Sequence, residues 1–243
     1  EAIKARLADL AAQLSGSSDI ERAGVGLRTL SDPAQREPAL ALLADMLARP
    51  SFPAALLARE KAQMLTALRE AEDDPAGRGE RALRRLMYGA HPYALSARIN
   101  ADSVRRISRD DVLRFWRAHY TARRAVVSLV GDISRADAER IAEQLTARLP
   151  AGADALKPIP PVSAPAQGGR EQLLHSGTQT HLFLGMPVLR RDDPDYYALL
   201  VMNYLFGGAG FGSRLMETAR EQRGLTYGIY SSVENYRHRS EER

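Results

Sequence analysis

Apolar side chains recur every three to four positions through most of the first 149 residues, and this spacing predicts a series of amphipathic helices. The predicted helices cover about residues 3–14, 33–49, 53–72, 75–89, 103–107, 108–120 and 134–149. Between residues 20 and 30 the pattern alternates instead, with Val25, Leu27 and Thr29 on one side, which predicts a strand. The valine-rich run at 125–130 predicts a further strand, buried on both faces.

Three of the helix starts carry residues that cap helix N-termini. Asp32 and Asp74 each precede a proline, which is the order of an N-cap followed by proline at the first helical position. Ser108 and Asp111 have the spacing of a capping box. The pairs Asp73-Asp74 and Asp192-Asp193 each precede a proline, and both are interpreted as helix caps rather than as a metal site.

A proline-rich stretch at 150–169 separates two halves of the chain. It contains five prolines and three glycines without helical or strand periodicity, which is typical of a linker. We therefore predict one domain at 1–149 and a second at 170–243, both of the α+β class. The second is predicted to contain strands at 172–175 and 180–187, a helix from 193, a glycine-rich turn at 207–212, a helix at 213–223 and a strand at 226–236.

Composition excludes several classes of function. The formal net charge is +4, but arginines alternate with acidic residues along the helices, so a nucleic-acid surface is not expected. The chain has no cysteine, which excludes disulfides, thiolate catalysis and cysteine-bound zinc. No apolar run approaches the roughly 18 residues that cross a membrane, so no membrane partner is expected, and no signal peptide is visible.

The most specific motif lies in the last forty residues. Four glycines at 207–212 precede an amphipathic helix, and Arg220 near the end of that helix precedes Tyr227 by seven positions. This block resembles the C-terminal half of the insulinase/pitrilysin metallopeptidases, the inverzincins. Weaker matches at His91-Pro92 and at Val130-Gly131-Asp132 extend the resemblance over nearly the whole chain.

The resemblance implies a fold and a role for two residues. The implied fold has two homologous α+β units, each a mainly antiparallel sheet with helices on one face, and both ends are incomplete relative to the family. Arg220 and Tyr227 are implied to bind a peptide substrate, by donating hydrogen bonds to a main-chain carbonyl and to the tetrahedral oxyanion. Arg223 is a competing candidate that fits the seven-residue offset less well. Tyr230 is expected to face away from Tyr227 and to pack internally.

The zinc motif of that family, His-x-x-Glu-His, is absent from these residues. The five histidines include no pair four positions apart, which two imidazoles on one helical turn need in order to bind one zinc ion. The positions that correspond to the third, glutamate ligand are Thr66 and Ala67, whose side chains do not bind zinc. We therefore expect no metal site and no catalytic residue in this chain, and zinc in a partner subunit.

Three functions are compatible with these observations. The first is the substrate-binding, non-metal subunit of a two-chain zinc peptidase that encloses unfolded peptides in a chamber, with a homologous zinc-bearing subunit or a second copy as partner. The second is a catalytically silent structural or assembly subunit, which the Arg220 and Tyr227 pair disfavours. The third is an active zinc peptidase whose motif lies upstream of Glu1, which Thr66 and Ala67 disfavour. The resemblance favours the periplasm over the cytoplasm.

Overall fold

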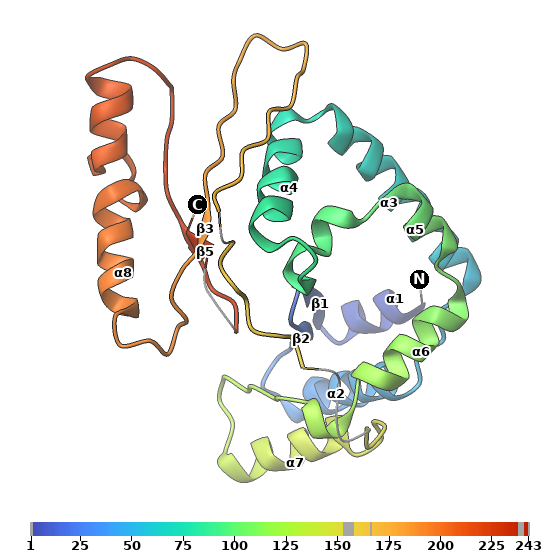
Figure 1. Cartoon of the computed structure of the whole chain (residues 1–243). Coiled ribbons are helices and arrows are strands. Elements are labelled where there is room, and N and C mark those ends of the chain that lie inside the picture. The colour runs from blue at the N-terminus through green and yellow to red at the C-terminus, as the bar shows by residue number, and fades with distance from the viewer. Residues whose placement is uncertain (1, 153–157, 166, 238–240, 243) are drawn as a thin grey trace. The chain divides into compact units, whose positions relative to one another are not determined.

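The computed structural model describes residues 2–152, 158–165, 167–237 and 241–242 (Figure 1). The chain divides into two compact units, the first made of Glu1–Thr66 and Ala101–Lys157 and the second of Ala67–Asn100 and Pro158–Arg243. Each unit combines helices with a small antiparallel sheet, so the predicted α+β class is confirmed. Homology between two units and the division at 150–169 stay predictions, and residues 153–157 and 166 of that linker lie outside the described part.

The first unit contains a β-hairpin and most of the helices. β1 (Gln13–Ser18) and β2 (Ala23–Arg28) pair antiparallel, with Gln13 opposite Arg28 and Ser18 opposite Ala23. The helices are α1 (Ala2–Asp9), α2 (Pro33–Ala48), the first part of α3 (Ala54–Asp73), α5 (Ala101–Arg106), α6 (Arg109–His119) and α7 (Arg135–Thr146). The predicted helix at 3–14 is shorter than expected, because Ala11 has a left-handed backbone, with φ of 49°, that turns the chain into β1.

A small apolar core joins α1, the hairpin and α2. Its buried members are Leu7, Ala12, Ala39 and Leu42, and Leu10, Leu14, Leu27 and Met46 pack against them. α2 also packs against α7, where Ile141 is almost fully buried. Because short helices are marginal in water, the burial of these apolar faces supplies most of their stability.

The predicted buried strand at 125–130 is wrong. The segment pairs with no strand within the described residues, and Val126 and Val130 are 92% and 101% exposed. Valine favours strands, but a strand forms only where a neighbouring backbone supplies the ladder of hydrogen bonds. The described part of the first unit supplies no such neighbour for these residues.

The described part of the second unit contains the end of α3, two further α-helices, several short 3-10 and π-helical turns and three short strands. The helices are α4 (Pro75–Tyr88) and α8 (Tyr196–Asn203), and α8 continues into a π-helix at Tyr204–Gly208. β3 (Met186–Pro187) and β4 (Val233–Glu234) both pair antiparallel with β5 (Glu241–Glu242), which gives the order β3-β5-β4. None of the helices described is both long and apolar enough to cross a bilayer.

The strands predicted for this unit are mostly absent. The prediction at 172–175 is wrong, and the strands predicted at 180–187 and 226–236 reduce to β3 and β4. Leu182 and Leu184, whose alternation favours a strand, are largely exposed and face no partner strand in the described residues. Alternation of apolar residues therefore does not by itself produce a ladder here.

Aromatic residues tie α4 to the segment around β4. Tyr93 is fully buried, and the centre of its ring lies 4.6 Å from that of His91 and 4.7 Å from that of Tyr236. The guanidinium of Arg84 donates a hydrogen bond to the Tyr236 hydroxyl at 2.9 Å, and this hydroxyl donates to the Glu234 carboxylate at 2.7 Å. Packed rings with satisfied polar ends stabilise this part of the unit in place of a larger sheet.

The predicted helix caps are confirmed at Asp32, Asp74 and Ser108, whereas the cap predicted at Asp193 is wrong, because α8 begins at Tyr196 and has no side-chain cap. The Asp32 carboxylate accepts the Ala34 amide at 2.9 Å, and the Asp74 carboxylate accepts two amides at the start of α4. Ser108 and Asp111 form the reciprocal pair of a capping box. These bonds satisfy backbone donors that the first turn of a helix leaves unpaired.

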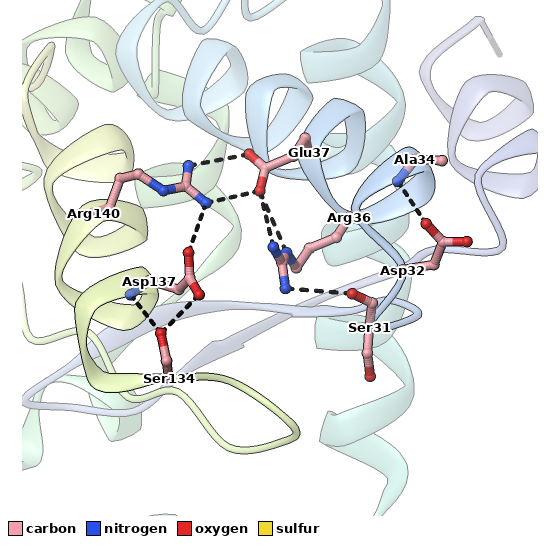
Figure 2. A network of polar contacts seen from close by, with 8 residues as sticks. All are labelled: Ser31, Asp32, Ala34, Arg36, Glu37, Ser134, Asp137 and Arg140. Atoms are coloured by element: carbon pink, nitrogen blue, oxygen red, sulfur yellow. Dashed lines mark hydrogen bonds and ion pairs between the residues drawn. The ribbon is translucent and has the colours of Figure 1, made fainter.

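Figure 2 shows a polar network that joins the N-terminal halves of α2 and α7. The Glu37 carboxylate accepts hydrogen bonds from Arg36 at 3.2 Å and from Arg140 at 2.9 Å. Arg140 also pairs with Asp137, which exchanges hydrogen bonds with the capping residue Ser134. The Arg140 guanidinium is the main reason that the pKa of Glu37 is lowered from its ordinary value.

We expect Glu37→Gln to reduce the free energy of unfolding by about 1 kcal/mol at pH 7, because the side chain is partly exposed and solvent weakens both ion pairs. Folding lowers the pKa of Glu37, so its contribution is present above the unfolded pKa of about 4.3. That contribution is lost as the pH falls through the folded value. Urea unfolding should therefore separate wild type and variant fully at pH 7 and progressively less below about pH 4.

Glu60→Gln is the matched control, because it removes an ion pair between neighbouring side chains that are 60% and 62% exposed. We expect it to change the free energy of unfolding by less than about 0.5 kcal/mol. Equal losses in the two variants, or a loss at Glu37 that grows in acid, would contradict the network.

Candidate functional site

Arg220 and Tyr227, the two residues predicted to bind peptide, lie close together in the second unit. The guanidinium carbon of Arg220 is 5.3 Å from the centre of the Tyr227 ring. It is also 4.7 Å from the centre of the Phe211 ring. Both distances are within the range of cation–π attraction, so the guanidinium interacts with both rings.

The helical segment that carries Arg220 has defined ends. Ser213 is fully buried and caps its start, where the Met216 amide donates to the Ser213 hydroxyl at 3.4 Å. Gly224 ends it with φ of 59°, and its amide donates to the Arg220 carbonyl at 2.9 Å. Between these ends the turns at Met216–Glu221 are π-helical, a distortion that often accompanies functional sites.

Hydrogen bonds hold the backbone around Tyr227, whereas the Tyr227 side chain is exposed to solvent. The Ile229 amide points at the sulfur of Met216, at 3.4 Å, which holds this stretch against the helical segment. The Thr226 hydroxyl both donates to the Gly228 carbonyl and accepts the Gly228 amide. The Tyr227 side chain is 88% exposed, so its hydroxyl projects into solvent from an anchored backbone.

The hydrogen-bond donors of both side chains are unused within the described residues. Arg220 has an ion pair with Glu221 at 3.8 Å, but its guanidinium donates no hydrogen bond there. The Tyr227 hydroxyl has no hydrogen-bond partner in that part of the chain either. Because arginine carries five N–H donors, the pair presents several donors beside an apolar ring. Such a set suits a carbonyl, carboxylate or oxyanion with a neighbouring apolar group.

Gly207 allows the segment that follows Tyr227 to pack against the π-helix at Tyr204–Gly208. A methyl group at Gly207 would lie 2.4 Å from the Ser231 hydroxyl and 2.5 Å from the Ser231 backbone nitrogen. The Ser231 hydroxyl in turn donates a long hydrogen bond of 3.5 Å to the Asn203 carbonyl. Glycine is therefore needed here for close approach of two backbones.

No group of three or more histidine, aspartate or glutamate residues within the described part is placed to hold a metal ion. Thr66 and Ala67, at the positions that correspond to the glutamate ligand of the family, both lie on α3. The His175 and His181 rings lie 6.1 Å apart, but both nitrogens of His175 face backbone groups of the same loop. The described residues therefore do not fit a zinc site, and His238 lies outside them.

Sequence reasoning missed Phe211 and misjudged Tyr230. Phe211 is 67% exposed and stands among four glycines, so the available signal was a large aromatic residue in an otherwise flexible turn. Tyr230 is 78% exposed, so the prediction that it packs internally is wrong. The short strand β4 begins only at Val233, and strand alternation does not reach Tyr230.

A protein-family model described as the peptidase M16 inactive domain matches residues 106–240, which is more than half of the chain. An uncharacterized zinc protease of Streptomyces coelicolor is 30% identical over 185 residues, which are 73% of this chain and 39% of that protein. A non-peptidase homologue of Helicobacter pylori is 30% identical over 196 residues, which are 80% of this chain and 44% of that protein.

Solved structures give the same result. A peptidase M16 inactive domain from Pseudomonas fluorescens matches with a TM-score of 0.89 and 37% identity, over 99% of this chain and 58% of that one. A protease from Helicobacter pylori matches with a TM-score of 0.79 and 18% identity, over 99% of this chain and 58% of that one, which shows a shared fold. The chain thus spans about two-fifths to three-fifths of the length of these relatives.

We expect Gly207→Ala to disturb the packing of the segment around Ser231, which follows Tyr227 in the chain. The new methyl group would collide with Ser231, and we expect a cost of about 1–3 kcal/mol in the free energy of unfolding, as for other overpacked positions. Gly212→Ala is the control, because a methyl group there meets no atom within 4 Å. Hydrogen exchange at residues 229–233 should be faster in the first variant and unchanged in the second. Equal behaviour of the two would refute the close packing of Gly207 on Ser231.

Proposed function

This chain belongs to the peptidase M16 family, in the part described as the inactive domain, and from that premise we propose that it is a substrate-binding, non-metal component of a zinc peptidase. Arg220 and Tyr227 bind the peptide in this proposal. The zinc ion is held by a homologous partner subunit, or by another part of an assembly that includes a second copy of this chain. The substrates are unfolded peptides enclosed in a chamber, and we keep the periplasm as the proposed compartment.

One observation carries the proposal: the Arg220 guanidinium lies close to two aromatic rings while its donors stay unused in the described part of the chain. A cation–π contact does not use the N–H donors of a guanidinium, which lie along the edges of the planar group. Charge-assisted hydrogen bonds from those edges to a main-chain carbonyl are about twice as strong as neutral ones. The exposed Tyr227 hydroxyl adds a second donor beside them.

Hydrogen bonds to main-chain atoms suit a substrate that is unfolded and variable in sequence. Every residue of a peptide offers a carbonyl, so recognition does not depend on which side chain is present. Phe211 adds an exposed apolar surface beside Arg220, against which a peptide side chain can lie. If the bound carbonyl becomes tetrahedral during hydrolysis, the same donors would stabilise the oxyanion more than the ground state.

Indirect observations support the proposal that this chain binds the peptide while a partner holds the zinc ion. The family description and the name of the Helicobacter relative both indicate a catalytically inactive member. Other relatives are named zinc proteases, and this chain corresponds to only part of their length. The described residues supply peptide-binding donors and do not fit zinc, so we assign them binding and not metal chemistry.

A structural or assembly subunit is the second candidate, and the name of the Helicobacter relative favours it. An active peptidase with its own zinc motif outside these residues is the third. Zinc analysis of the purified natural protein separates the third candidate from the other two, because only that one contains stoichiometric metal without a partner. Peptide binding at Arg220 separates the first candidate from the second.

We expect Arg220→Ala to weaken peptide binding by roughly tenfold to a hundredfold, since a hydrogen bond to a charged group contributes about 1.5–3 kcal/mol. Tyr227→Phe removes one neutral donor and should cost roughly two- to tenfold. The measurement is fluorescence anisotropy of the natural protein, titrated into a fluorescein-labelled, unstructured 20-residue peptide. Turnover of this peptide after addition of a zinc-bearing partner should fall by roughly ten- to a thousandfold in the same variants.

Arg223→Ala is the matched control, because it removes an exposed arginine three positions away that contacts neither ring. It should leave the dissociation constant within about twofold of wild type, a difference near 0.4 kcal/mol. Equal losses for Arg220 and Arg223 would indicate nonspecific charge attraction. No binding by the wild-type protein, with or without partner, would leave the structural role as the better assignment.

A further inference from the structure

A groove in the first unit lies between β2 and the segment 124–133, and its volume is about 560 Å³. Residues 23–31 line one side, and β1 contributes none of the lining, so the groove follows the edge of β2 that faces away from its partner. Leu40, Leu43 and Ile141, from α2 and α7, supply apolar lining between the two sides. The groove is open to solvent, and exposed Val126 and Val130 belong to its lining.

The backbone on both sides of the groove is unpaired within the described residues. β2 belongs to a two-stranded sheet there, so the groups on its second edge have no strand partner. Residues 126–133 form no backbone hydrogen bond in that part of the chain. Two rows of unpaired N–H and C=O groups on either side of one groove are complementary to a strand inserted between them.

Two buried hydroxyl groups in the lining also lack partners. The Oγ1 atoms of Thr29 and Thr121 are both inaccessible to solvent and form no hydrogen bond in the described part. Thr121 as a whole is 2% exposed. A buried hydroxyl without a partner costs about 1–3 kcal/mol, so the lining of the groove carries unsatisfied polar groups beneath its surface.

The side chains along the groove indicate what the occupant carries. Val25 on β2 and Leu129 on the opposite side are each more exposed than a core residue of their size. Both line the groove together with the apolar residues of α2 and α7. A strand with apolar side chains at every second position would cover them and leave its alternate side chains on the other face.

We propose that this groove is the binding site for an extended strand of the same protein, drawn from polypeptide outside residues 1–243. The longer relatives supply the length, because this chain spans 58% of the Pseudomonas structure that it matches over 99% of its own residues. A two-stranded hairpin is marginal in water, whereas three or more strands over an apolar layer are stable. The occupant is therefore permanent and not a substrate that enters and leaves. The proposal does not depend on Arg220 and Tyr227.

The test is hydrogen–deuterium exchange on the protein as its own gene expresses it. The amides at 126–130, and those of β2 that do not pair with β1, should exchange at least about a hundredfold more slowly than unstructured amides, as in a paired sheet. Unstructured exchange rates at 126–130 would overturn the proposal. So would a natural polypeptide confined to residues 1–243, or protection that appears only after an unstructured peptide is added.

A pair of variants tests independently whether a strand covers Leu129. Leu129→Asp places a charge under the inserted strand and should lower Tm by roughly 5 °C or more. It should also raise exchange at 126–130. Leu56→Asp makes the same change at an exposed position on α3, outside the groove, and should alter neither quantity. Equal effects of the two changes would show that Leu129 is not covered and would refute the inserted strand.

Discussion

The pairing of backbone groups is the constraint on which the rest of this structure depends. A helix pairs its own backbone, whereas a strand depends on a neighbour that can be distant in sequence. The long helices α2, α3 and α4 form where periodicity and caps predict them. The segments at 125–130 and 180–184, whose valines or leucines favour strands, lie unpaired in the described part. The molecule therefore combines well-formed helices with sheets of only two or three strands.

The same constraint decides how much the sequence predicts. Asp32, Asp74 and Ser108 were predictable as caps, because each contact reaches only two or three residues along the chain. The exposure of Val126 and Val130 was not predictable in the same way, because strand pairing depends on a partner strand that lies elsewhere in the chain. Local propensity is thus a sound guide to the helices here and a poor guide to the strands.

The candidate site shows a similar division. The family resemblance implied a shared role for Arg220 and Tyr227, and the structure places the two side chains close together. The contact of Phe211 with Arg220 could not be predicted from the sequence, because it depends on the path of the glycine-rich turn and on the π-helical turns. Contacts set by irregular backbone have no periodic signature, and they are the ones that orient the guanidinium.

Separation of binding from hydrolysis follows from the kinds of side chain present. Donors such as Arg220 and Tyr227 stabilise charge on an oxygen, but they do not generate the nucleophile that attacks a peptide bond. A zinc site needs three or more imidazoles or carboxylates that converge on one point, and the described residues provide no such group. A donor set of this kind contributes to catalysis only if a nucleophile from elsewhere reaches the carbonyl it holds. Without that nucleophile, the same hydrogen bonds would stabilise the bound ground state alone, so the proposed role of this donor set is binding without cleavage.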